Sequence, residues 1–308
     1  MPPRPATFSI VARDPETEAV GVAVQSKFVS VGAVVPFAAA DAGAIATQSY
    51  ANVAYGPDGL EKLRAGKDAE TVVEELTAAD EEAPSRQVGV VGQDGSVAAF
   101  TGEECLDHAG HVEGDQYTVQ GNILEGEETL SAMAEAYENA DGGLPEGLLA
   151  ALEAGNAAGG DRRGEQAAAM YVAKPEGGYD GRSDRWIDVR VDDHEEPIQE
   201  LKRVFRIYDV TLLERAEPEE LRELSGQTAE AVAGTLAELG HFEGESTAAW
   251  GEPERAALED FRGVNNFENH SLPVLEDAIA RGWEAAAGEG SERLIDAIWQ
   301  GLSRLDRA

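Results

Sequence analysis

The sequence predicts an α+β fold in which two β-sheets pack face to face under covering helices, followed by a small all-α region. Hairpins with period-two alternation occupy 7–26 and 87–101, and helical segments lie between and after them. Strand patterns end near residue 196, beyond which every periodic segment is helical. We therefore expect a mixed domain over 7–205 and a helical domain over 206–308.

Each element follows from periodicity and from turn residues. The first hairpin joins Thr7–Arg13 to Ala19–Ser26, and Asp68 is a plausible N-cap for the second helix. The other elements of the first domain are strands within 33–46, helices over 57–65 and 69–79, strands over 87–91, 96–101 and 117–122, helices over 127–139 and 146–156, and strands over 167–173 and 186–194. In the helical region we expect helices over 196–215, 219–223, 229–239, 252–261, 274–284 and 292–305.

Composition places the chain among globular proteins. Of its 308 residues 42% are hydrophobic, and no run approaches the ~20 apolar residues that cross a bilayer. The first residues contain no apolar signal segment, so we expect no secretory signal, no membrane partner and a cytoplasmic location. Cys105 is the only cysteine, which excludes an internal disulfide framework. An incidental small residue is favoured there over a catalytic thiol.

The charge balance is strongly acidic. Sixty carboxylates against 24 cations give a net charge of −36, and the acidic residues are spread along the whole chain. Such a shell repels itself in dilute buffer, and molar salt shortens the Debye length to ~3 Å. We interpret it as salt adaptation of the kind seen in salt-in halophiles, with an acidic mesophile protein as the alternative. No basic stripe is visible, so nucleic acid is not an expected partner.

Two polar clusters stand at strand ends and are candidates for a site. One is Gln25 and Ser26 at the end of the second strand, and the other includes Thr47, Gln48 and Asn52 after an apolar run. Hydroxyl and amide groups are costly to bury unless each finds a partner. Their occurrence at two strand ends, beside a threonine at the head of the first strand, indicates a site more than a core.

Thr7 is the candidate nucleophile. A threonine hydroxyl at a free chain terminus has its own α-amino group as a general base, since that amine titrates near ~8. The competing interpretation is an ordinary strand opener. Asn122 follows Gly121 at the end of a strand, and its side-chain amide could stabilise an oxyanion. A structural turn is the equal alternative there.

The segment Trp186–His194 alternates with a sharp period of two. One face is polar and carries Asp188, Arg190, Asp192 and His194. The other face is apolar and carries Ile187, Val189 and Val191. The polar face is either a solvated surface with ion pairs or the wall of a cleft in which Arg190 holds an anionic group. A third interpretation uses Asp188, Asp192 and His194 for metal-assisted hydrolysis.

Two further loops offer polar side chains. Asp161, Arg162 and Gln166 precede the strand at 167–173 and could reach into a cleft, or form a solvated connection. His108 and His111, with Asp107 and Asp115 nearby, are metal ligands in type, but no third ligand is fixed by the spacing, so loop histidines are favoured. We therefore expect no metal and no other cofactor. The sequence contains no phosphate loop, dinucleotide fingerprint or serine-hydrolase elbow.

Taken together, several segments in order resemble the family known as domain of unknown function 1028, which is grouped with the N-terminal nucleophile hydrolases. The matching stretches are 7–12, 21–26, 46–49 with Asn52, 55–56, 120–122, 161–164 with Gln166, and 188–194. The resemblance covers about 7–205 and implies a four-layer αββα sandwich that hydrolyses an amide bond. On this analogy Thr7 is the nucleophile, and Ser26, Thr47 and Asn122 are its polar partners.

One departure from that superfamily concerns the N-terminus. Six residues precede Thr7, so either the Ala6–Thr7 bond is cut, or the start is placed differently, or the amine-assisted mechanism does not operate. The C-terminal part resembles a small peptidoglycan-binding-like helical module, through 229–244, 252–261 and 266–268. We carry over its helical fold and leave its ligand open, with a lid or an oligomerisation role as alternatives.

The leading functional hypothesis is a hydrolase of a small amide, ureido or peptide-like compound. The expected substrate-binding residues are Gln25, Gln48, Asn52, Asp161, Arg162, Asp188, Arg190 and His194. The competing hypothesis is a non-catalytic protein that binds a metabolite on the same scaffold. A small molecule is the expected partner in both cases, and a homo-oligomer is left open.

Overall fold

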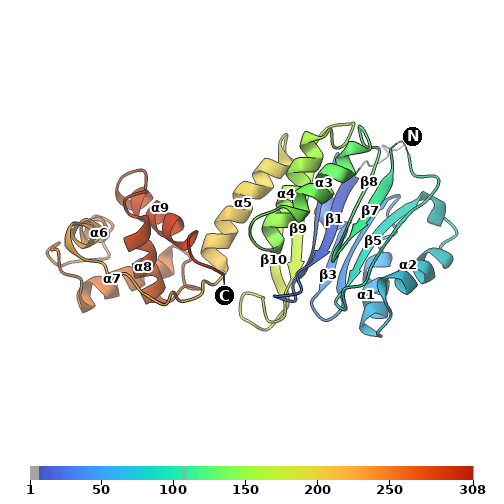
Figure 1. Cartoon of the computed structure of the whole chain (residues 1–308). Coiled ribbons are helices and arrows are strands. Elements are labelled where there is room, and N and C mark those ends of the chain that lie inside the picture. Colours follow the sequence, from blue (N-terminus) through green and yellow to red (C-terminus); the bar gives the residue numbers. More distant parts are fainter. Residues whose placement is uncertain (1–6, 107, 308) are drawn as a thin grey trace. The chain divides into compact units, whose positions relative to one another are not determined.

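The structure is a computed structural model that describes residues 7–106 and 108–307 (Figure 1). The chain divides into two compact units, which meet between Phe205 and Arg206. The expected combination of antiparallel sheets with helices, and the all-helical C-terminal region, are confirmed in the described residues.

The first unit contains a six-stranded antiparallel sheet with the order β10-β9-β2-β1-β8-β7. Thr7–Arg13 (β1) lies at its centre, between Val20–Ser26 (β2) and Tyr117–Asn122 (β8). The outer strands are Ala167–Ala173 (β9), Arg185–Val191 (β10) and Gly110–Gly114 (β7). Because β1 is central, a residue at its head is flanked by a strand on either side.

A second, four-stranded antiparallel sheet has the order β3-β4-β5-β6. Its strands are Pro36–Ala39 (β3), Gly43–Ser49 (β4), Arg86–Gly92 (β5) and Val97–Thr101 (β6), and the short 3-10 helix Val31–Ala33 (η1) precedes β3. The two sheets contact each other through β1 and β2 on β4 and through β8 on β5. Polar strand ends of both sheets thereby meet in one interface.

Helices contact the outer faces of the two sheets. Glu128–Glu138 (α3) and Leu144–Ala157 (α4) pack on the six-stranded sheet, and Tyr55–Arg64 (α1) and Ala69–Ala78 (α2) pack on the four-stranded sheet (Figure 1). Asp68 caps α2 as expected, since its carboxylate accepts a hydrogen bond from the Thr71 N–H at 2.8 Å.

Strand β7 was not expected from the sequence. Its segment, Gly-His-Val-Glu-Gly, has two glycines and two charged or polar side chains, so it lacks an apolar period-two signal. It forms by pairing with β8 at the edge of the sheet, where His111 lies opposite Gln120. His111 is therefore a strand residue, which corrects the expectation that it lies in a loop.

The second unit contains Gly226–Glu238 (α6), Glu252–Val264 (α7), Leu272–Gly282 (α8) and Gly290–Leu302 (α9); Pro197–Leu212 (α5) crosses the boundary between the units. Its apolar core includes Leu236, Phe261, Leu275 and Ile298.

The helix expected over 219–223 does not form. Pro218 precedes it, and the Arg222 N–H is taken by the buried carboxylate of Asp277 at 2.8 Å instead of a helical carbonyl. None of the helices in the described part of the chain combines the length and apolar character that a bilayer crossing requires.

Candidate functional site

The head of the central strand carries a row of hydroxyl and amide side chains. In register, Thr7 of β1 lies opposite Ser26 of β2 on one side and Asn122 of β8 on the other. The hydroxyl oxygens of Thr7 and Ser26 are 3.0 Å apart, and Thr7 is only 2% exposed. Among the described residues Asn122 Oδ1 has no hydrogen-bond partner although it is buried. The structure thus brings together three of the four expected catalytic residues.

Behind this row lies a buried set of four amide side chains and one hydroxyl. We call it the inter-sheet amide network; its members are Ser9, Gln48, Gln87, Gln120 and Asn122. The Ser9 hydroxyl donates to Gln48 Oε1 at 2.7 Å and accepts from Gln120 Nε2 at 2.6 Å. Gln87 Oε1 accepts from Gln48 Nε2 at 2.8 Å and from Asn122 Nδ2 at 3.0 Å. All five residues are at most 1% exposed. The network therefore cross-links the two sheets and ends at the neighbour of Thr7.

Gly89 on β5 makes room for this network. A Cβ atom at this position would lie 2.2 Å from Gln120 Oε1, which is far inside van der Waals contact. The glycine is thus explained by the close approach of a side chain from the other sheet. It shows that the glutamine of β8 reaches to the backbone of β5.

The network continues toward the surface through Gln87. Its Nε2 donates to the Thr101 hydroxyl at 2.9 Å and to the carbonyls of Gly110 and Gly121 at 2.9 and 2.8 Å. The Thr101 hydroxyl is in turn 2.9 Å from Nδ1 of the exposed His111. A chain of hydrogen bonds therefore runs from an exposed imidazole to the amide beside Thr7.

The loop at Asp161 also lies at the Thr7 end of the sheet. Asp161 pairs with Leu124, two residues after Asn122, and its Oδ2 accepts from the Lys27 N–H at 2.8 Å. Its carboxylate also binds the Arg163 guanidinium at 2.9 Å and is buried. Asp161 thus fixes the end of β2, and the Arg162 N–H donates to the Ile123 carbonyl at 3.3 Å, directly after β8.

Two predicted residues lie on faces turned away from Thr7. Because side chains alternate along a strand, Gln25 points away from the sheet interface that Ser26 faces, and Thr47 points away from Gln48. Among the described residues the buried Gln25 amide has no hydrogen-bond partner at either polar atom. The Thr47 hydroxyl donates to the Asn52 carbonyl at 3.1 Å. Neither residue is brought together with the Thr7 hydroxyl.

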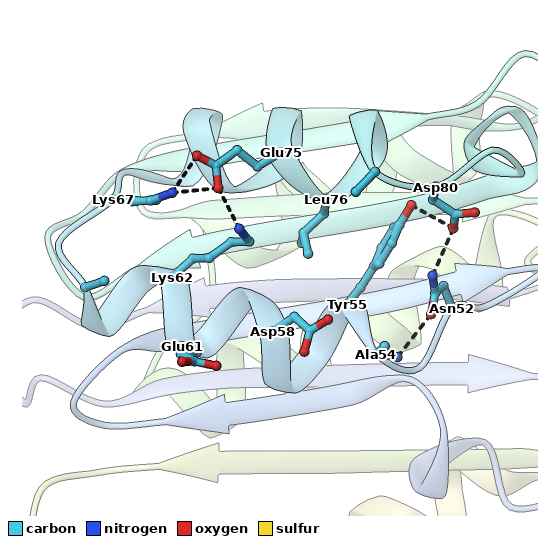
Figure 2. Close-up of a pocket in the computed structure, with 12 residues that line it drawn as sticks. Asn52, Ala54, Tyr55, Asp58, Glu61, Lys62, Lys67, Glu75, Leu76 and Asp80 are labelled. Atoms are coloured by element: carbon cyan, nitrogen blue, oxygen red, sulfur yellow. Dashed lines mark hydrogen bonds and ion pairs between the residues drawn. The ribbon is translucent and has the colours of Figure 1, made fainter.

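Asn52 borders a cavity of about 540 Å³ between α1 and α2 (Figure 2). At one end Asp80 accepts hydrogen bonds from Asn52 Nδ2 at 2.9 Å, Tyr55 OH at 3.0 Å and Arg86 Nε at 3.0 Å. The Arg86 guanidinium holds the pKa of the Asp80 carboxyl well below its usual range. Burial, with the carboxylate next to it, raises the pKa of Tyr55 above its ordinary value.

The other end of this cavity holds an ion-pair cluster. Glu75 lies 2.6 Å from Lys62 Nζ and 2.5 Å from Lys67 Nζ. Figure 2 marks both ion pairs by dashed lines. The two lysines lower the pKa of Glu75 to about 2. At each end of the cavity, Asp80 or Glu75 is thus paired with neighbouring side chains of the protein. These pairs explain local stability better than they explain ligand binding.

Asp188 and Arg190 line a second cavity of about 370 Å³, together with Arg185 and Tyr171. Asp188 lies 3.3 Å from Arg185 Nη1 and 3.4 Å from Arg190 Nε. Both sequence interpretations thus describe the same face, which carries ion pairs and also forms a cavity wall. His194 lies apart from this cavity's lining; it is exposed, and its Nδ1 accepts from the Glu196 N–H at 3.0 Å.

The described residues contain no group of three or more His, Cys, Asp or Glu side chains placed to hold a metal ion. Asp188, Asp192 and His194 are therefore not gathered into a ligand set. Asp107, which the sequence placed near His108, lies outside the described residues, as do residues 1–6, on which the release of the Thr7 amine depends.

Sequence reasoning missed several of the residues that build these sites. Ser9, Gln87 and Gln120 lie inside strands that were expected, and their polarity at buried positions was the available signal. Asp80 and Arg86 flank a loop and carried no pattern. Tyr171 joins Asp188 through the pairing of β9 with β10, whereas Arg185 lies on β10 itself, before the register shift between Arg185 and Ile187.

Comparison with known proteins places this geometry in a family. The model of a family of unknown function, DUF1028, matches residues 7–201, and a model described as "Putative peptidoglycan binding domain" matches residues 211–296. The crystal structure of protein SPO2555 from Silicibacter pomeroyi, a DUF1028 protein, is 33% identical with a TM-score of 0.61, covering 66% of this chain and 89% of that chain. No curated protein matches. The chain therefore belongs to the DUF1028 family of unknown function.

Proposed function

We propose that the first unit is a hydrolase of a small amide, ureido or peptide-like compound, with Thr7 as its nucleophile. The observation that supports this most is the row at the head of β1, where the Thr7 hydroxyl lies 3.0 Å from the Ser26 hydroxyl beside Asn122. We propose the four-layer αββα sandwich of the N-terminal nucleophile hydrolases as the architecture, which the helix–sheet and sheet–sheet packing favours.

The chemistry needs a free amine on Thr7, so the bond between residues 6 and 7 must first be cut. The Thr7 hydroxyl then attacks the carbonyl carbon of the substrate while the α-amine accepts its proton. That proton passes to the leaving amine, and water hydrolyses the ester on Thr7 to release the acid. The Ser26 hydroxyl orients the nucleophile throughout.

Asn122 is the candidate for stabilising the oxyanion. Its amide has two N–H donors, of which one is used by Gln87 Oε1 at 3.0 Å. A donor held by a buried network needs little reorganisation during the reaction, which is what oxyanion stabilisation requires. Arg162, at the same end of the sheet, is the proposed substrate-orienting residue.

The test combines the mass of the purified protein with substitutions at Thr7. A species that begins at Thr7 and hydrolyses a member of a panel of N-acyl amino acids, ureides and dipeptides is expected. Thr7→Ala should abolish turnover, and Thr7→Ser, which keeps a hydroxyl, should retain part of it. Unchanged turnover in Thr7→Ala, measured on folded protein, would refute the nucleophile.

The second candidate function is metabolite binding without chemistry. The arginine-lined cavity of about 370 Å³ favours it, because a binding protein needs such a cavity and no nucleophile. An intact chain that retains residues 2–6 and shows no turnover would support this alternative.

A small molecule is the proposed partner, and a homo-oligomer is one candidate assembly. We propose the cytoplasm as the location on the acidic composition alone, although the match of residues 211–296 is compatible with cell-wall association. Fractionation of the native cells, with detection of the protein in wall and lysate, would decide between the two.

A further inference from the structure

The cavity beside Arg190 opens at the side of the two-sheet interface. β10 is the edge strand of the six-stranded sheet and β3 is the edge strand of the four-stranded sheet. The cavity is lined from both sheets and from η1, with Asp188 and Arg190 on its β10 wall. The inner face of β10 therefore forms a wall of this cavity.

We propose that this cavity is a binding site for a small molecule that carries a carboxylate on a flat or apolar body. The charged side chains that line it are Arg185, Asp188 and Arg190, which leave one positive charge in excess. This excess is notable in a chain of net charge −36. An anion is attracted here by a local pair of guanidinium groups.

The two guanidinium groups keep donors for a ligand. Asp188 approaches Arg185 through Nη1 and Arg190 through Nε, at 3.3 and 3.4 Å. A guanidinium has five N–H groups in a planar fork, so most of them point elsewhere. The shared aspartate positions both groups, and their remaining N–H groups suit the two oxygens of a carboxylate.

Gly32 on η1 has no side chain and therefore leaves room for the side chain of Arg190. A Cβ atom there would lie 2.5 Å from the Ala169 Cβ and 2.7 Å from the Arg190 Cδ. The stem of Arg190 thus runs over a backbone that has no side chain, between η1 and β9. This close packing orients the guanidinium along the cavity wall and limits its freedom.

The rest of the lining is apolar or aromatic, so it favours a ligand whose remaining part is apolar. Phe37, Pro36 and Leu60 line it together with Tyr171, and the Arg185 guanidinium lies 5.7 Å from the Tyr171 ring centroid. A volume of about 370 Å³ is within the range of small-ligand sites. A flat group with one carboxylate fits this combination of ring surfaces and donors.

This site is separate from Thr7. Arg190 pairs with Ala169, and three strand spacings separate β10 from β1 in the order β10-β9-β2-β1. With about 4.8 Å between strands, the two positions are roughly 14 Å apart across the sheet. Thr7, Ser26 and Asn122 are not among the residues that line the cavity, so the inference does not depend on the proposed hydrolase; it deepens the metabolite-binding alternative.

The test uses benzoate as the probe and benzamide as its neutral analogue, titrated into the full chain by calorimetry in about 1 M KCl. Benzoate should bind saturably, whereas benzamide should bind at least ~10-fold more weakly, because only the carboxylate accepts the charge-assisted hydrogen bonds. Arg190→Gln and Arg185→Gln should each weaken benzoate binding ~10-fold or more.

Two further variants separate the site from general effects of charge and of folding. Arg190→Lys keeps the charge and loses the fork, so it should also weaken binding ~10-fold while preserving the melting temperature. Arg182→Gln removes an arginine that is 87% exposed in the loop between β9 and β10, and it should leave binding unchanged. No saturable binding of benzoate, equal binding of benzamide, or equal losses in Arg182→Gln and Arg190→Gln would overturn the proposal.

Discussion

The interface between the two sheets has an apolar end and a polar end, and the two ends are built from the same strands. At the apolar end Val11 and Val22 pack against Ala44 and Val91. At the polar end the inter-sheet amide network replaces such contacts with hydrogen bonds between Ser9, Gln48, Gln87, Gln120 and Asn122. Both ends are excluded from water.

This difference shows that polar side chains are not needed to join the two sheets or to exclude water from the interface. Apolar packing already joins the sheets over part of their length, and replacing fully paired polar groups by apolar ones of equal shape is often nearly neutral. A network of neutral amides has a high cost when one member is lost, but it fixes register and position. Its location beside Thr7 suggests that it positions the candidate site.

The largest expected effect concerns salt and not the interface. Between 0.1 M and about 2 M KCl the free energy of unfolding should rise by about 5 kcal/mol, comparable to the whole stability of a domain, because the repulsion of the acidic shell is screened. Chemical denaturation at several KCl concentrations measures this rise. A flat dependence would contradict the salt-adaptation interpretation.

The salt series also sharpens the comparison between the two ends. The inter-sheet amide network carries no formal charge. The loss in the free energy of unfolding caused by Gln87→Leu should therefore be the same at low and at high salt, and so should the loss caused by Val91→Ala. A salt-dependent difference between these variants would show that the polar end is coupled to surface charge.

Substitution of Gln87 should have the next largest effect. Gln87→Leu removes the acceptor of Gln48 and Asn122 and the donor to two carbonyls, so we expect a loss of about 3 kcal/mol in the free energy of unfolding. Val91→Ala, at the apolar end of the same strand, should cost about 2 kcal/mol. Urea denaturation measures both losses.

The double variant Gln48→Leu/Gln87→Leu provides the internal check. Removing both partners leaves fewer unpaired groups than the sum of the single changes, so its loss should be about 1 kcal/mol smaller than additive. Strict additivity would mean that the network does not act as a unit.

Gly89→Ala should cost about 2 kcal/mol. Its Cβ would lie 2.2 Å from Gln120 Oε1, so the glutamine must move and weaken its 2.6 Å hydrogen bond to Ser9. Gly110→Ala is the matched control in a strand, since its Cβ meets only Leu130 at 3.5 Å. Equal melting temperatures of the two variants would contradict the close approach.

The sequence predicted the elements of this interface better than their faces. Period-two alternation placed β1, β2 and β5 correctly because their apolar runs are bounded by turn residues. It also implied that Gln25 and Ser26 point to opposite faces, although both were assigned to one site. The contact of Ser9 with Gln48 joins two sheets, and no local pattern encodes such a contact.

The candidate cavities were predictable only in part. Alternation in β10 marked Asp188 and Arg190 as a polar face, and the structure shows that this face borders a cavity. Gly32, Phe37 and Tyr171 complete that cavity from other elements, so the topology had to be known first. The Asp80 cluster depends on the approach of α1 to a loop, which sequence spacing does not reveal.

The smallest expected effect tests whether ion pairs at the surface behave differently from the neutral interface. Glu75 has a pKa of about 2 in the folded protein because Lys62 and Lys67 stabilise its charged form, compared with about 4.3 in an unfolded chain. A lowered folded pKa stabilises the fold above the unfolded value, and this contribution is lost as the pH falls from about 4.3 toward 2. The melting-temperature difference between wild type and Glu75→Gln should therefore be small at pH 6 and shrink further near pH 2.5. In a Lys62→Met/Lys67→Met background the same substitution should show no such pH dependence, and a persistent dependence would mean that other groups cause it.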